Sequence, residues 1–83
     1  MPRHYSTHDR KNLIGRRVRL ARLRRNPPIT QEELTARLEV RGVHIDRVGI
    51  SKLENQQRRV TDKELVALAE ALNVTVPWLL GEK

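Results

Sequence analysis

Apolar residues along this chain recur at helical spacing, and no stretch shows the strict alternation that is typical of a strand. The first apolar stripe consists of Ile14, Val18 and Ala21, with Leu13 and Leu20 beside it. Asp9 is placed to cap this helix, which we expect to run to about Arg25. The prolines of "NPP" at 26–28 end it, because proline lacks a backbone donor and disfavours helix in the residue before it.

A second helix begins at Thr30, where "TQEE" has the pattern of a capping box. In such a box the threonine hydroxyl accepts a backbone N–H and the carboxylate of Glu33 reaches back to the cap. Leu34 and Leu38 form its apolar stripe. Gly42 is expected to end it, because glycine readily takes the left-handed conformation found after a helix.

The third helix is short and largely polar. Asp46 is a good N-cap, and the helix is expected to continue to about Asn55. Its strongly apolar positions, Ile50 and Leu53, lie three residues apart and therefore on one side. The remaining positions carry polar or small side chains and lead to a basic end at 58–59.

Two further helices follow. Thr61 to Glu64 form a second capping box, ahead of a fourth helix with four side chains expected inward: Leu65, Leu68, Ala69 and Leu72. Asn73 is the expected stop. Thr75 caps a last short helix, in which Pro77 is tolerated within the first turn, and Gly81 ends it.

These elements predict an all-α domain of five short helices over residues 9–83, preceded by a flexible arm at 1–8 that is polar and has no period. The second and third helices, joined by a short turn, form a predicted helix-turn-helix. A chain of 83 residues is expected to form one domain with a compact core. Because the chain has one Trp, one Tyr and no Phe, this core must be aliphatic.

The amino-acid composition reduces the number of function classes that fit this protein. The chain has no cysteine, which removes disulfide and thiolate chemistry and suits a reducing compartment. We see no signal peptide or membrane span and expect a cytoplasmic protein. The net charge is +7, and residues 1–25 hold nine basic side chains against the single acid Asp9. This balance fits a polyanionic partner, although solvated charge that keeps the protein soluble is the alternative.

Four segments together resemble the phage-repressor and Cro-like (xenobiotic-response-element type) helix-turn-helix regulators of bacteria. The segments are "IGRRVRLAR" (14–22), "TQEELTARL" (30–38), "ISKLENQQR" (50–58) and "LVALAEALNVTVPWLLG" (65–81). The chain departs from the family in a longer link at "RRNPP", a longer turn at "RGVHIDR", and Gln56 where a glycine often follows "EN". The resemblance implies a five-helix repressor-like fold that binds double-stranded DNA.

In that fold Ile50 and Leu53 hold the third helix to the core, and its other side chains face the major groove. The resemblance then implies a DNA-binding set of Gln31, Arg47, Val48, Gly49, Ser51, Lys52, Asn55, Gln57 and Arg58. Base edges in the major groove suit such side chains. Gly49 would let the backbone approach DNA, or would serve close helix packing. Arg58 would grip phosphate or be an ordinary loop charge.

The family also implies three further assignments. Gln31 contacts a phosphate at the start of the second helix, where free N–H groups favour an anion. Arg22 and Glu54 form an internal ion pair that orients the third helix. Trp78 and Leu80 belong to a dimer interface, with core packing as the alternative for both, and a two-fold dimer suits a palindromic operator.

The resulting prediction is a sequence-specific transcription regulator, a dimeric repressor without a cofactor. The alternative is a protein-interaction module, such as the antitoxin of a toxin–antitoxin pair. An enzyme is not expected, because Ser51 has no evident base partner and there is no phosphate-binding glycine loop. The histidines His4, His8 and His44 lack metal-ligand spacing, so no metal site is expected.

Overall fold

The computed structural model describes residues 10–82, so the predicted arm at 1–8 and the expected cap Asp9 lie outside the described residues. Within this range there are five helices: α1 (Gly15–Leu23), α2 (Gln31–Val40), α3 (Arg47–Glu54), α4 (Asp62–Leu72) and α5 (Val76–Leu79). All regular secondary structure over 10–82 is helical. The prediction of an all-α, five-helix fold is confirmed.

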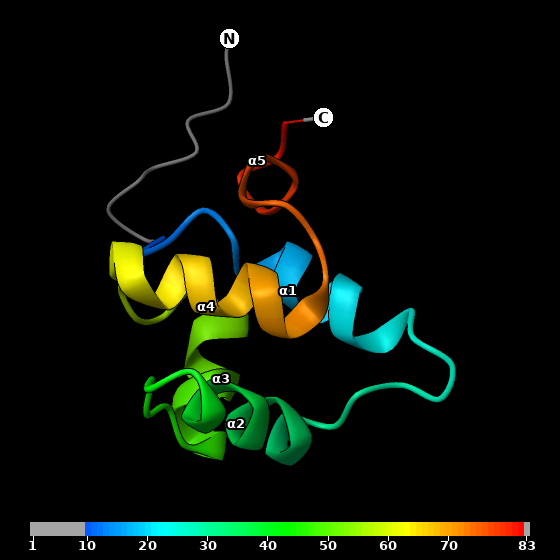
Figure 1. Cartoon of the computed structure of the whole chain (residues 1–83). Coiled ribbons are helices and arrows are strands. Elements are labelled where there is room, and N and C mark those ends of the chain that lie inside the picture. Colours follow the sequence, from blue (N-terminus) through cyan, green and yellow to red (C-terminus); the bar gives the residue numbers. More distant parts are fainter. Residues whose placement is uncertain (1–9, 83) are drawn as a thin grey trace, which may run out of the picture.

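The helices are arranged around α4, which packs against α1, α2 and α5. Helix α3 packs against α1 and α2. As Figure 1 shows, α2 and α3 lie together at one end of the molecule, and α5 lies at the opposite end. The two helices of the predicted helix-turn-helix therefore form one exposed end of the domain.

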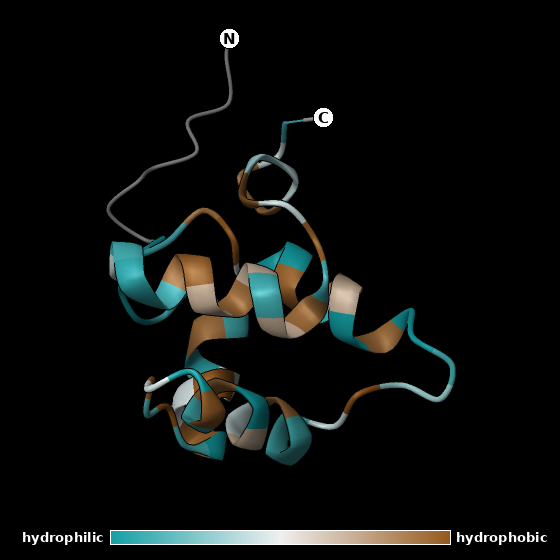
Figure 2. Ribbon diagram, in the orientation of Figure 1, coloured by the Kyte–Doolittle hydropathy of each residue, from teal (hydrophilic) through white to brown (hydrophobic). Residues whose placement is uncertain are grey.

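An aliphatic core joins the helices. Every helix contributes at least one side chain that is almost completely buried, and the largest of these are Val18, Leu34, Leu38, Ile50, Leu53, Leu68, Leu72 and Leu79. Hydrophobic and hydrophilic residues alternate along the longer helices in Figure 2, so each of them has an inward and an outward side. Burial of this apolar surface is the main force that holds a domain of this size together.

The predicted N-caps are present at four helices. The side chains of Thr30, Asp46, Thr61 and Thr75 accept backbone N–H groups in the first turns of α2, α3, α4 and α5. The box at Thr61 is complete, because the Glu64 carboxylate also accepts the Thr61 N–H. At α2 the hydroxyl half of the expected box is present, whereas the Glu33 carboxylate accepts from Arg37 at 2.7 Å.

The predicted ends of α2 and α4 are also confirmed. Asn73 ends α4 in the left-handed conformation with a φ of 56°. Gly42 follows α2 with a φ of 78°, a value that favours glycine. The turn between α2 and α3 spans residues 41–46 and includes Ile45, whose side chain is buried and anchors the turn to the core.

The first helix is shorter than predicted. It begins at Gly15 and ends at Leu23, instead of running from Asp9 to about Arg25. The Asn12 side chain accepts the N–H groups of Ile14 and Gly15, and the helix therefore starts five residues later than a cap at Asp9 predicts. Leu13 and Leu20 are 67% and 52% exposed. The buried apolar stripe of α1 is therefore narrower than predicted and is the one that contains Val18.

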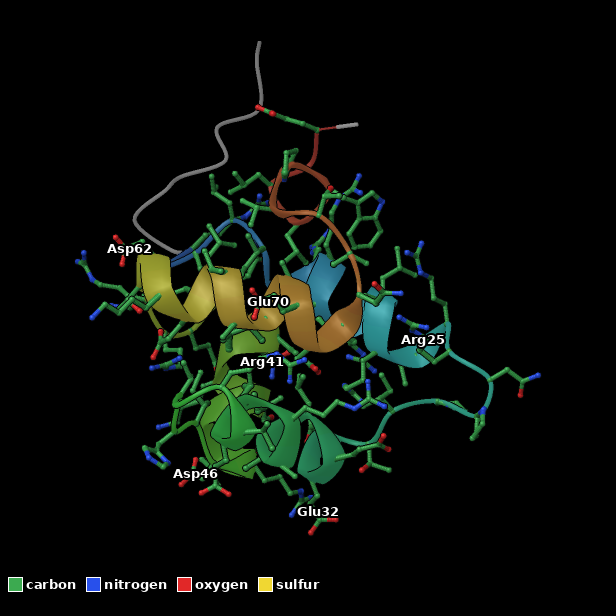
Figure 3. The ribbon with its side chains drawn as sticks, viewed as in Figure 1. Arg25, Glu32, Arg41, Asp46, Asp62 and Glu70 are labelled. Carbon is green, nitrogen blue, oxygen red and sulfur yellow. The ribbon has the colours of Figure 1, made fainter. Side chains whose placement is uncertain are left out.

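Arginines stabilise the C-terminal end of α4. Arg25 donates to the Leu72 carbonyl at 2.7 Å, and Arg37 donates to the Ala71 carbonyl at 3.0 Å. Figure 3 shows Arg41, the C-cap of α2, near Glu70 of α4, an ion pair with an N–O distance of 3.5 Å. Cations at the last carbonyls of a helix also interact favourably with its dipole, so α1 and α2 are both attached to this end of α4.

Candidate nucleic-acid interface

Helix α3 is fixed to the core by the two side chains that the sequence predicted. Ile50 and Leu53 are completely buried. At its start, the Asp46 carboxylate accepts the Gly49 N–H at 2.7 Å. With two aliphatic anchors below and a cap at its entry, α3 presents Arg47, Val48 and Lys52 to solvent.

Five predicted DNA-binding residues come together on the outer side of α3. A surface pocket of about 290 Å³ is lined by Gln31, Arg47, Val48, Ser51 and Lys52. Arg47, Val48 and Lys52 are exposed, and Val48 is 61% exposed despite its apolar side chain. The start of α2 and the outer face of α3 therefore form one continuous polar surface with a single aliphatic contact point.

The expected ion pair between Arg22 and Glu54 is confirmed and is almost completely buried. Arg22 Nε donates to Glu54 Oε2 at 2.8 Å and Nη2 donates to Oε1 at 2.9 Å, which is a bidentate arrangement. A third nitrogen of Arg22 donates to the Ile29 carbonyl at 3.0 Å. The pair thus joins α1, α3 and the segment before α2, and a buried charge that loses its partner is strongly destabilising.

The same carboxylate positions Gln31. The Gln31 Nε2 donates to Glu54 Oε1 at 3.2 Å, which leaves the second Nε2 hydrogen and the amide oxygen for a ligand. The buried ion pair therefore orients the side chain at the N-terminal end of α2 as well as α3 itself.

Gly49 has an internal reason to be glycine. A Cβ added there would lie 2.8 Å from Cγ2 of Ile45 and 3.1 Å from Oδ1 of Asp46. The residue is half-buried against the turn that precedes α3. The packing alternative accounts for this glycine, and its approach to DNA stays a prediction.

The other three predicted residues lie at the far end of α3. Asn55 is the C-cap and is exposed, and Gln57 is exposed with its N–H donated to the Lys52 carbonyl at 2.8 Å. Arg58 is half-buried and forms an ion pair with Glu64 at 3.2 Å. Its guanidinium is therefore partly engaged within the protein, while its neighbour Arg59 is exposed.

Sequence reasoning missed Asn12 and the conformation of Gln56. Asn12 is 8% exposed, and its side chain makes hydrogen bonds both to the start of α1 and to the end of α3. Gln56 has a φ of 62°, which explains why a glycine is frequent at this position in the family that the sequence resembles. An asparagine three residues before Gly15 is a local signal for a helix start that could have been recognised.

The C-terminal residues Trp78 and Leu80 differ in their surroundings. Trp78 is half-buried against the core, and the guanidinium carbons of Arg17 and Arg24 lie 4.7 and 4.5 Å from its ring centroid. These are cation–π distances. Leu80 is 41% exposed and lies at a surface pocket of about 300 Å³ that also includes Leu13 and Leu65.

No group of three or more metal-ligating side chains occurs among the described residues, and the exposed His44 lies 3.4 Å from the carboxylate of Glu39. His4 and His8 lie outside the described residues. No helix within residues 10–82 is long and apolar enough to cross a membrane.

The domain is all-helical, and its third helix is anchored by two aliphatic residues and is polar on its outer side. These are the features of a helix-turn-helix protein. Residues 19–79 match the model of a helix-turn-helix family. The chain belongs to this family, the Cro-like and phage-repressor-like DNA-binding transcription regulators.

Two known proteins illustrate the relationship. Control protein C.SmaI of Serratia marcescens is 39% identical over 72 residues, which cover 87% of this chain and 77% of that protein. The crystal structure of the P22 c2 repressor in complex with synthetic operator 9T superposes with a TM-score of 0.68 and 29% identity. That match covers 87% of this chain and 98% of the repressor chain.

Proposed function

We propose that this protein is a sequence-specific regulator of transcription that binds double-stranded DNA through α3 and represses from a palindromic operator as a homodimer. The observation that carries the proposal is the polar surface formed by Gln31, Arg47, Val48, Ser51 and Lys52 over a firmly anchored helix. The operator bound by the P22 c2 repressor in its crystal structure supports the same mode of action. We place the protein in the cytoplasm and assign it no catalytic step.

Each side chain on the outer face of α3 suits a particular feature of DNA. Arg47 and Lys52 are donors for the O6 and N7 atoms of guanine, and Val48 fits the methyl group of thymine. Ser51 can donate to or accept from either kind of base edge. Gly49 lies between Val48 and Ser51 in the sequence, and its backbone would come near the groove with them.

A second group of residues suits the phosphate backbone. Gln31 stands at the N-terminal end of α2, where free N–H groups and the helix dipole attract an anion. Asn55, Gln57 and Arg58 lie after α3 and would contact the backbone of the duplex beyond the reading helix. Phosphate contacts position the protein and make its affinity fall steeply with salt.

For the homodimer, we propose that Leu80 lies at the centre of the pairing surface with Trp78 beside it. Arg17 and Arg24 lie over the Trp78 ring, so its contribution comes from the rest of its exposed surface. The α5 end lies opposite α3 in Figure 1, so a partner at this end leaves the reading helix free.

The protein-interaction alternative, an antitoxin for example, would use the apolar pocket beside Leu80 for a different protein. Such a role predicts a main affinity that depends little on salt. Binding of DNA and of a candidate partner at two salt concentrations separates the two functions, because only the DNA affinity depends on counterion release.

The decisive experiment selects bound sequences from a random DNA pool and then tests variants on the winning sequence. Lys52→Ala should weaken binding by about 1–3 kcal/mol, the value of one good base contact, and relax the base preference at one position. Arg16→Ala, which removes an exposed charge on α1, is the control. The proposal fails if the pool yields no preferred sequence, or if both variants lose the same affinity.

A further inference from the structure

Asn12 is a buried polar residue with hydrogen bonds in two directions. Its Oδ1 accepts the N–H groups of Ile14 at 3.1 Å and Gly15 at 2.8 Å. Its Nδ2 donates to the carbonyls of Leu53 at 3.0 Å and Arg58 at 2.8 Å. One half of the amide therefore starts α1, and the other half binds the chain at and beyond the end of α3.

Neighbouring backbone groups reinforce this attachment. The Lys11 N–H donates to the Gln56 carbonyl at 2.9 Å, and Gln56 Nε2 donates to the Asn12 carbonyl at 3.1 Å. We call these bonds and the two donated by Asn12 the Asn12 clamp. It joins residues 11–12 to residues 53–58, more than forty positions along the chain.

Besides the clamp, the segment is held by the last turn of α3, where the Gln56 and Gln57 N–H groups donate to the Leu53 and Lys52 carbonyls. After α3 the chain turns through Gln56, whose φ of 62° is unusual for a residue with a side chain. The segment then runs without regular structure to Thr61, the cap of α4. The Asn12 amide fixes the Arg58 carbonyl directly, while the Arg58 side chain is held separately by Glu64.

We propose that Asn12 is a positioning residue for DNA binding: its amide group holds segment 55–59 at the place where this segment meets the phosphate backbone. The proposal rests on the proposed function, because it concerns the contacts assigned there to Asn55, Gln57 and Arg58. Asn12 itself does not touch DNA in this scheme. A residue in the turn before α1 would thereby position the part of the interface that lies beyond α3.

The two halves of the amide can be separated by substitution. Asn12→Ser keeps a hydroxyl oxygen close to the Ile14 and Gly15 N–H groups, and serine is a good capping residue. Its side chain is shorter by one bond and does not reach both distant carbonyls. Asn12→Ala removes the cap together with the two bonds of the clamp that the Asn12 side chain donates. Ala69→Gly destabilises the interior of α4, away from the clamp, and is the control for lost stability.

The test measures the affinity of each full-length variant for the selected operator over a range of salt concentrations, at a temperature where all are folded by circular dichroism. We expect Asn12→Ser to bind about tenfold more weakly than the wild type. The slope of log affinity against log salt should become shallower by about one, since Arg58 is the charged residue among the three contacts and each phosphate that a cation neutralises contributes about 0.9. The base preference read by α3 should stay the same, and Ala69→Gly should bind nearly as the wild type does.

Each other outcome overturns the inference. If Asn12→Ser binds with the wild-type affinity and slope, the clamp does not position the interface, and the proposed function stands. If Ala69→Gly loses as much affinity as Asn12→Ser, the effect is one of stability alone. If the wild-type protein selects no sequence, the proposed function fails and the inference fails with it.

Discussion

At the scale of single residues, Thr35 has a polar group that the fold does not satisfy. Its hydroxyl oxygen is buried and has no hydrogen-bond partner among the described residues. A buried polar group without a partner lowers stability by about 1–3 kcal/mol, which is large against the total stability of a small domain. Thr35 lies on α2 next to the buried Leu34 and one turn after Gln31, the first residue of the helix.

We expect Thr35→Val to raise the free energy of unfolding by about 1 kcal/mol, because valine has the same shape and removes the unsatisfied hydroxyl. Urea denaturation measures the change as a shift in midpoint at constant slope. Thr75→Val is the matched control, since the same substitution there removes the cap of α5 and should destabilise the protein. A loss of stability in Thr35→Val would show that its hydroxyl has a partner in solution.

The residues that the sequence predicted well are those whose partners are close along the chain. Asp46 and Thr61 cap helices through N–H groups three positions away, so the local pattern contains the whole interaction. Asn12 was missed because the groups to which it donates lie 41 and 46 positions away. The Arg22–Glu54 pair spans 32 positions and was predicted only through the family resemblance.

At the scale of elements, α1 and α3 meet more closely than side chains normally permit. A Cβ added to Gly15 would collide with the carbonyl oxygens of Leu53 and Glu54. These atoms belong to the last turn of α3, whose backbone is fixed by the buried Leu53 side chain. Glycine at the first position of α1 therefore sets the distance between the entry of one helix and the exit of the other.

Gly15→Ala should accordingly lower the free energy of unfolding by about 1–3 kcal/mol, the usual range for overpacking, although alanine is the better helix former. Arg16→Ala places alanine at the next, exposed helical position and should change stability by less than about 0.5 kcal/mol. Thermal or urea unfolding compares the two. Equal stability of Gly15→Ala and the wild type would mean that α1 can move away from α3 at little cost.

Helix boundaries could be predicted where a cap and a stop are both local, and not otherwise. Helices α3, α4 and α5 begin after their predicted caps, Asp46, Thr61 and Thr75. The first helix was assigned too many residues, because its run of arginines permits a helix and says nothing of where it begins. The contacts of Asn12 and Gly15 with the end of α3 set its start, and these depend on the tertiary fold.

At the scale of the whole molecule, much of the positive charge of residues 16–25, which form α1 and its C-terminal end, serves the fold. Arg22 is paired with Glu54, Arg25 binds the end of α4, and Arg17 and Arg24 lie over Trp78. The basic N-terminal third of the sequence is therefore only partly available to a polyanion. The site on α3 depends less on this charge than on which side chains the two buried anchors, Ile50 and Leu53, leave facing outward.

The last prediction concerns assembly. A reading helix of eight residues contacts only a few base pairs, so a second copy bound one helical turn away would supply the rest of the specificity. If Leu80 lies in the pairing surface, Leu80→Lys places a charge in it, and sedimentation should show a monomer at concentrations where the wild type is a dimer. Affinity for the full operator should fall at least tenfold, while affinity for an isolated half-site should stay within about twofold, because loss of the partner removes avidity and no direct contact.

Val40→Lys, which adds the same charge at an exposed valine on α2, should keep the wild-type dimer. A wild-type protein that is monomeric both in solution and on its operator would contradict pairing through α5, and the selected DNA would then lack a two-fold repeat.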